Sequence, residues 1–127
     1  MRQERVPEGV RRFLLGAIAS VPHLEALLLL RGAPQAEWNG RAVAQRLFIS
    51  EERAKAILAD LRQRALIAES PAGIFRFAPA SAQDSATVDQ LADYYSRHIV
   101  EVANLLHAQL ERQALEFSEA FRLRKES

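Results

Sequence analysis

Three histidines, His23, His98 and His107, are the residues of this chain best suited to metal binding or acid–base chemistry. His98 and His107 lie nine residues apart, whereas two metal ligands on one helix face occupy positions i and i+4. The sequence contains no cysteine, which excludes thiolate metal sites and disulfides. No glycine-rich phosphate loop and no set of nucleophile, histidine and acid stands out. We therefore predict no metal site, no cofactor and no enzymatic activity.

Charged residues are distributed unevenly along the 127-residue chain. Residues 1–79 contain 12 Lys and Arg against 8 Asp and Glu, a net charge of +4, whereas residues 80–127 contain 5 against 8, a net charge of −3. A mildly basic first part is compatible with binding to nucleic acid but does not require it.

Hydrophobic periodicity predicts four helices before residue 66. The predicted ranges are 6–20, 21–31, 40–47 and 51–65. Ser20, Asn39 and Ser50 are residue types that cap helices, and they precede the second, third and fourth helices. The fourth helix is expected to bury one stripe of side chains, namely Ala54, Ile57, Leu58 and Leu61.

Two short runs of β-type residues, 66–70 and 74–78, flank the turn sequence Pro71-Ala72-Gly73 and predict one β-hairpin. From residue 85 onward there is no Gly or Pro, and apolar residues recur at helical spacing. We expect one long helix there, or two helices with a bend near residues 109–113. The predicted fold class is mainly α with a small β-hairpin, since three helices followed by a hairpin is the order of a winged helix-turn-helix domain. This domain would span 1–79, and a helical tail would span 80–127.

The segment Ala44-Gln45-Arg46-Leu47-Phe48-Ile49-Ser50 resembles the helix-turn-helix pattern. In that pattern a small residue lets two helices approach closely, an apolar residue fills the turn and a capping residue begins the second helix. Ala44, Ile49 and Ser50 fit these three positions. The continuation from Leu58 to Leu66-Ile67 resembles the passage from recognition helix to wing in MarR-type bacterial transcriptional regulators.

Phe48 departs from this pattern, which usually has a glycine at that position of the turn. The turn often requires a positive φ, and this backbone conformation is unfavourable for an aromatic residue. Either the turn is of another type, as in many winged domains, or the predicted helices are displaced by one residue.

The resemblance implies a bacterial transcriptional regulator that binds duplex DNA. In DNA-binding members of the family the second helix of the motif enters the major groove. Transferred by position, Arg53 and Lys55 would contact guanine or phosphate, while Arg41 and Arg46 would contact the backbone. The complete set of implied DNA-contacting residues is Arg41, Arg46, Ser50, Arg53, Lys55 and Arg76.

Two acidic residues, Glu51 and Glu52, begin the predicted recognition helix and would oppose phosphate binding. The expected wing also has no basic residue at its tip. These features favour a second hypothesis, a winged helix adaptor that binds protein rather than DNA. A third hypothesis is a ligand-sensing variant with a pocket near Trp38, for which no specific residue provides support.

The predicted tail contains a row of apolar residues spaced by four, four, three and four positions. This spacing places them on one face of a helix. The row consists of Leu91, Tyr95, Ile99, Val102 and Leu106. We expect it to bind a second copy of the chain in a homodimer, and the alternative is packing against the chain's own first domain.

The N-terminal sequence MRQERVPEG is polar and charged and does not resemble the start of a signal peptide. The longest apolar run, residues 24–30, is far shorter than the roughly 20 residues that span a bilayer. We therefore expect a cytoplasmic protein without a membrane span.

Overall fold

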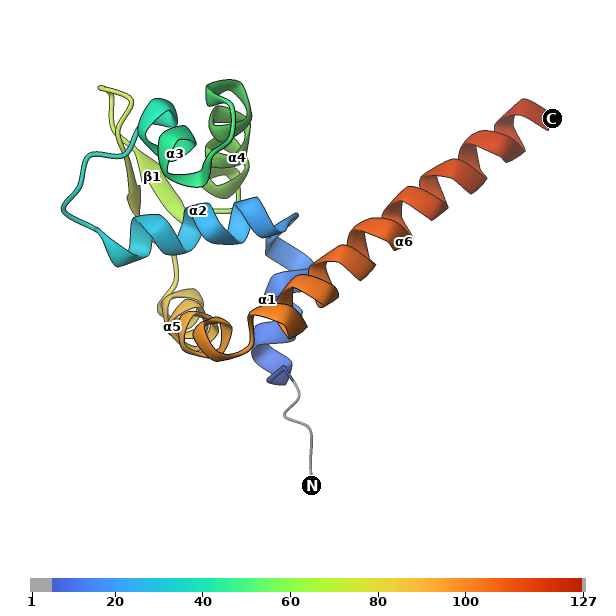
Figure 1. The fold of residues 1–127 in the computed structure, drawn as a ribbon, viewed down its shortest axis with the longest axis horizontal. Coiled ribbons are helices and arrows are strands. Elements are labelled where there is room, and N and C mark those ends of the chain that lie inside the picture. Colours follow the sequence, from blue (N-terminus) through green and yellow to red (C-terminus); the bar gives the residue numbers. More distant parts are fainter. Residues whose placement is uncertain (1–5, 127) are drawn as a thin grey trace.

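The computed structural model describes residues 6–126, together with their side chains up to residue 116 and at residue 118. The described chain is mainly helical and has one small antiparallel sheet (Figure 1). The helices are α1 (Glu8–Ala17), α2 (Val21–Gly32), α3 (Gly40–Leu47), α4 (Glu51–Gln63), α5 (Ala82–Arg97) and α6 (Ile99–Glu126), and the strands are β1 (Ile67–Glu69) and β2 (Phe75–Phe77). The predicted combination of helices with one hairpin is therefore confirmed.

Local capping interactions determine where three of the helices begin. The Ser20 hydroxyl accepts the His23 amide at 3.4 Å, and the Asn39 side chain accepts the Ala42 amide at 2.9 Å. The Ser50 hydroxyl accepts the Arg53 amide at 3.1 Å. Each bond satisfies an amide that has no partner within its own helix. Consequently α2, α3 and α4 begin where the capping residues predict.

The two strands form a hairpin in which Ile67 pairs with Phe77 and Glu69 pairs with Phe75. Gly73 adopts a φ of 80° in the turn, which glycine accommodates without steric strain. The Phe75 amide also donates to the Trp38 carbonyl at 2.7 Å. The connector between α2 and α3 therefore forms an isolated bridge with the outer side of β2.

One hydrophobic core runs through the domain and includes residues from all six helices of the described chain. The predicted stripe of α4 is buried: Ala54, Leu58 and Leu61 are fully enclosed and Ile57 is 2% exposed. The core continues beyond residue 79, since Val88 and Leu91 of α5 belong to the same cluster. Within the described residues, no single helix is both long enough and apolar enough to cross a membrane.

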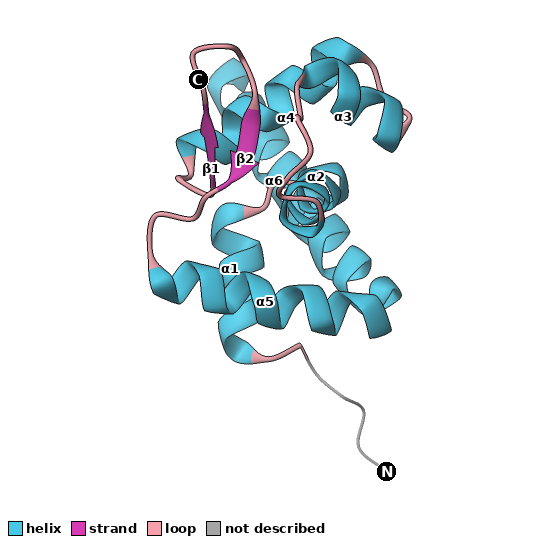
Figure 2. Ribbon diagram, turned by 90° about the vertical axis from the view of Figure 1, so that its left-hand side faces the viewer, coloured by secondary structure: helices cyan, strands magenta, loops and turns pink. Residues whose placement is uncertain are grey.

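The tail contains two helices, but the break lies at His98 and the expected bend near residues 109–113 is wrong. His98 leaves the helical conformation with a φ of −136° and a ψ of 51°. Both α5 and α6 pack against α1, so the chain has to turn between them (Figures 1 and 2). The sequence has no glycine or proline at this position. We therefore attribute the turn to the packing of both helices on α1.

The row expected to bind a second copy is largely covered within the single chain. Leu91 and Val102 are fully buried, and Tyr95 and Leu106 are 8% and 1% exposed. Ile99 alone remains open, at 55%. The break at His98 divides the row between two helices that pack on α1. The expectation that these five residues form a free dimerisation face is therefore wrong for all but Ile99, and the alternative of packing within the chain applies.

Candidate nucleic-acid interface

The turn between α3 and α4 has the conformation that glycine normally adopts, although Phe48 occupies it. Phe48 has a φ of 57° and a ψ of 44°, in the left-handed region, and its residue surface is 94% exposed. The Ile49 amide donates to the Ala44 carbonyl at 3.1 Å and closes the turn. The turn is not of another type, because Phe48 has a positive φ. The helices are not displaced by one residue either, because α3 and α4 begin at the predicted positions.

Two small residues allow α3 and α4 to approach closely. Ala44 is 7% exposed and Ala54 is fully buried, as the helix-turn-helix pattern requires. Ser50 lies at the start of α4, and its hydroxyl oxygen accepts the Arg53 amide. Of the predicted contact residues, Ser50 therefore has a structural function as the helix cap, while its hydroxyl hydrogen is still able to donate.

Arg53 and Lys55 do not point in the same direction from α4. Residues two positions apart on an α-helix are separated by about 200° around its axis. The two basic side chains therefore flank the exposed face of α4 on opposite sides. The centre of that face is formed by Glu52, Ala56 and Ala59, which lie opposite the buried stripe and are all exposed.

Lys55 is held across α4 toward the start of α3. Its ammonium group lies 3.2 Å from the Glu51 carboxylate. Its methylene stem covers Gly40, where an added Cβ would lie 2.7 Å from the Lys55 Cγ. The charge of Lys55 is thus already partly balanced, and Gly40 permits this close contact.

The other predicted basic residues are exposed on three elements: Arg41 and Arg46 on α3, Arg53 on α4 and Arg76 on β2. The Arg46 guanidinium lies 5.8 Å from the centre of the Trp38 ring, a cation–π contact. Within the described part of the chain, none of these four arginines forms an ion pair with a carboxylate.

Several arginines elsewhere in the molecule do have carboxylate partners. Arg31 binds Asp89 at 2.9 Å, and Arg62 binds Glu69 at 3.0 Å. Arg97 binds Asp93 at 2.6 Å. The arginines of the candidate interface therefore differ from these three in keeping their guanidinium groups available for an external anion.

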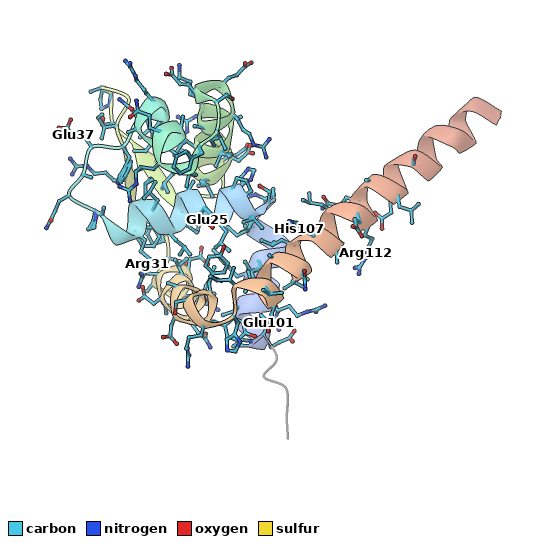
Figure 3. The ribbon with its side chains drawn as sticks, in the orientation of Figure 1. Glu25, Arg31, Glu37, Glu101, His107 and Arg112 are labelled. Carbon is cyan, nitrogen blue, oxygen red and sulfur yellow. The ribbon has the colours of Figure 1, made fainter. Side chains whose placement is uncertain are left out.

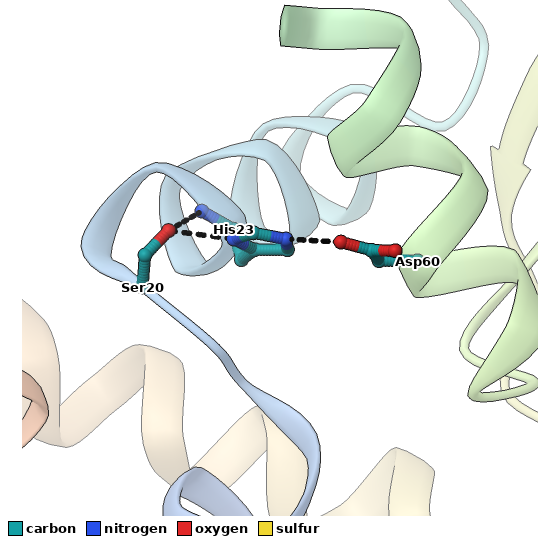
Figure 4. A network of polar contacts seen from close by, with 3 residues as sticks. All are labelled: Ser20, His23 and Asp60. Carbon is teal, nitrogen blue, oxygen red and sulfur yellow. Dashed lines mark hydrogen bonds and ion pairs between the residues drawn. The ribbon is translucent and has the colours of Figure 1, made fainter. Parts of the chain in front are cut away.

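A polar network that the sequence analysis did not identify joins the buried Ser20 and His23 to the exposed Asp60 and so links α2 to α4 (Figure 4). The Ser20 hydroxyl lies 2.6 Å from His23 Nδ1, and Asp60 Oδ2 lies 2.8 Å from His23 Nε2. With neutral His23, Ser20 donates to Nδ1 and the Nε2–H group donates to Asp60. The only available signal was His23 three residues after a capping serine, which does not reveal the contact with Asp60.

The order Ser–His–Asp is that of a nucleophile activated by a base, but the surroundings differ from a catalytic site. Ser20 is 9% exposed, and its oxygen also accepts the His23 amide. A pocket of about 440 Å³ opens beside His23 and Asp60, but Ser20 does not line it. The network therefore holds the beginning of α2 against α4.

Trp38 is a core residue in this structure. It is 5% exposed, and its indole N–H donates to the Ala33 carbonyl at 3.1 Å. Among the described residues, no group of three or more His, Asp or Glu side chains could hold a metal ion.

No family model, curated protein or solved structure matches this chain.

Proposed function

We propose that residues 1–79 form a winged helix-turn-helix domain that binds duplex DNA, with the resemblance covering 20–79, and that the protein is a bacterial transcriptional regulator resembling the MarR type. The order α2, α3, α4 and hairpin supports this proposal. So does the packing of α4 against α3 and β1, together with the tight turn at Phe48.

The observation that carries the proposal is that three arginines without carboxylate partners in the described chain come from three elements that lie close together. Arg41, Arg53 and Arg76 come from α3, α4 and β2. Figures 1 and 2 place these helices and the hairpin turn at one end of the molecule, away from α5. Most protein–DNA hydrogen bonds go to the phosphates and sugars of the DNA. Arginines without partners inside the protein are able to bind these phosphates, and their binding releases the counterions that surround the DNA.

The shape of the exposed face of α4 is suited to entry into a major groove. Ala56 and Ala59 are short and would allow the helix to come close to the bases. Arg53 and Lys55 would extend toward the phosphates on the two sides of the groove. Glu52 opposes phosphate binding, although a carboxylate can accept a hydrogen bond from the cytosine amino group.

The salt dependence of DNA binding tests this proposal. Each lost phosphate contact reduces the slope of log K against log salt concentration by about 1. We expect Arg53→Ala and Arg76→Ala each to show this reduction, and Lys55→Ala to show less because Glu51 already balances its charge. The measurement is fluorescence anisotropy with mixed genomic DNA fragments over a range of salt concentrations.

Arg97→Ala is the matched control, because Arg97 lies on α5 and is paired with Asp93. It should leave both the affinity and the slope unchanged. If the intact protein fails to bind DNA at low salt, or if Arg97→Ala has the same effect as Arg53→Ala, the DNA-binding proposal is wrong.

The second candidate function is that of an adaptor that binds protein. It is favoured by Phe48, an almost fully exposed aromatic residue, which precedes Glu51 and Glu52 at the start of α4 by three and four positions in the sequence. Aromatic residues dominate the energetics of many protein interfaces. Absence of DNA binding at low salt, together with retained folding, would favour this candidate.

A further inference from the structure

A pocket of about 440 Å³ lies where the end of α4 meets the connection between α1 and α2. This volume falls within the roughly 300–1,000 Å³ of small-molecule sites. None of the residues assigned above to DNA lines it, so its function is independent of the DNA-binding proposal. The lining residues are Ala17, Ala19, His23, Asp60, Gln63 and Arg64.

Two side chains of opposite charge line this pocket without pairing with each other. Asp60 and Arg64 are four residues apart at the end of α4. Side chains at this spacing on a helix are close enough to form an ion pair, and Glu51 and Lys55 of the same helix do so at 3.2 Å. Among the described residues, no ion pair joins Asp60 to Arg64. Each of the two contacts a different partner outside α4.

The Asp60 carboxylate is oriented by a buried histidine (Figure 4). His23 is 9% exposed, and its Nε2 lies 2.8 Å from Asp60 Oδ2. The Ser20 hydroxyl lies 2.6 Å from the other ring nitrogen and holds the imidazole in place. Asp60 Oδ1 has no partner in the part of the chain that the structure describes. One oxygen of an oriented carboxylate is therefore free to accept a hydrogen bond from a ligand.

The Arg64 guanidinium is oriented by the end of α1. Its Nη1 donates to the Gly16 carbonyl at 2.7 Å. A guanidinium has five N–H donors, and no other contact of Arg64 occurs within the described residues. Nε and Nη2 of Arg64 therefore remain available to a carboxylate on a ligand.

We propose that this pocket binds a free α-amino acid with an apolar side chain. The ligand's carboxylate binds Arg64, and its ammonium group donates to Asp60. A simple anion is repelled by Asp60 and a simple cation by Arg64, whereas a ligand with both charges forms a charge-assisted hydrogen bond to each residue.

The dimensions of the pocket agree with this class of ligand. Residues four apart on a helix have Cβ atoms separated by about 5–6 Å, so the two charges of the ligand have to lie close together. In an α-amino acid a single carbon separates the ammonium group from the carboxylate. The methyl groups of Ala17 and Ala19 complete the lining and are suited to an apolar side chain.

NMR titration of the intact protein with valine tests the site, with three analogues that separate the two charges. Isovalerate lacks the ammonium group, isobutylamine lacks the carboxylate and isovaleramide carries no charge. We expect valine to shift the amide resonances of Gly16, Ala19 and Gln63 and to bind at least about tenfold more tightly than each analogue, because each analogue loses a charge-assisted hydrogen bond. Binding of any analogue as tightly as valine, or no binding of valine, would overturn the proposal.

Substitution of the two charged residues tests the roles assigned to them. Asp60→Asn removes the charge but keeps an oxygen that accepts from His23, and Arg64→Gln removes the opposite charge. Each should weaken valine binding by at least about tenfold, with unchanged helical circular dichroism. Arg62→Gln is the matched control, because Arg62 lies on the same helix outside the pocket and pairs with Glu69. It should leave the affinity unchanged, and an equal loss in Arg62→Gln and Arg64→Gln would contradict the assigned role of Arg64.

Discussion

Phe48 combines a backbone conformation that is unfavourable for its residue type with an aromatic ring that contacts almost nothing. A residue with a side chain in the left-handed region loses roughly 1–2 kcal/mol relative to the usual helical conformation. The exposed ring gains little from burial in return. Strain of this kind at an exposed position is often associated with function. Substitutions of Phe48 therefore distinguish an effect on stability from an effect on binding better than substitutions elsewhere.

Phe48→Gly should raise the free energy of unfolding by about 0.5–1 kcal/mol. Glycine relieves the strain at positive φ, and its greater freedom in the unfolded chain offsets part of this gain. Urea denaturation provides the measurement. Phe48→Ala is the control, because it removes the ring but keeps the strained conformation, and it should change the stability little. Equal stabilisation by alanine would show that the exposed ring, and not the backbone, is the unfavourable feature.

At the scale of elements, two polar contacts attach α5 to α2. Arg31 donates to Asp89 through both Nε and Nη2, at 3.0 and 2.9 Å. The Tyr95 hydroxyl donates to the Glu25 carboxylate at 2.9 Å. Glu25 and Arg31 both lie along α2 where it passes α5 (Figure 3). These contacts help determine how the first tail helix lies against the domain.

The Tyr95 contact predicts a dependence of stability on high pH. Burial, the hydrogen bond to Glu25 and the negative charge of Glu25 raise the pKa of Tyr95 from 10.0 to about 12. The folded protein therefore holds this proton more tightly than the unfolded chain. The resulting stabilisation is complete below pH 10 and is lost between pH 10 and 12. Free energies of unfolding measured at pH 9 and pH 11 should fall less in Tyr95→Phe than in the unchanged protein, and an identical fall in both would contradict this assignment.

At the scale of the whole molecule, the first and last thirds of the described chain depend on each other. α1 packs against α5 and α6, and its Val10 and Leu14 are fully buried. The domain boundary predicted at residue 79 stays a prediction, and the hydrophobic core is continuous across this position.

Two truncations should therefore behave differently. A chain that ends after residue 109 keeps the buried residues of α5 and α6 and should unfold cooperatively at nearly the same temperature. A chain that ends after residue 79 loses Val88, Leu91, Val102 and Leu106 from the core. Each such side chain contributes about 1.5–3 kcal/mol, so their loss approaches the whole stability of a typical domain. Thermal unfolding followed by circular dichroism distinguishes the two. A stable, cooperative fragment 1–79 would show that the tail is dispensable.

Local interactions made much of this structure predictable from the sequence. The capping groups of Ser20, Asn39 and Ser50 act within three residues, so the beginnings of α2, α3 and α4 follow from the sequence directly. The hairpin likewise follows from its turn residues and from β-type residues on both sides. The buried stripe of α4 follows from helical periodicity, because a helix with one apolar face must cover it.

Contacts between distant residues decided the remaining features. The apolar row of the tail required a covering surface, and only the folded chain identified that surface as α1 instead of a second copy. The break at His98 follows from the same packing and has no local signal. The Ser20, His23 and Asp60 network joins residues up to 40 positions apart. Periodicity shows which side chains need partners, but only the tertiary arrangement of the helices determines which partners they find.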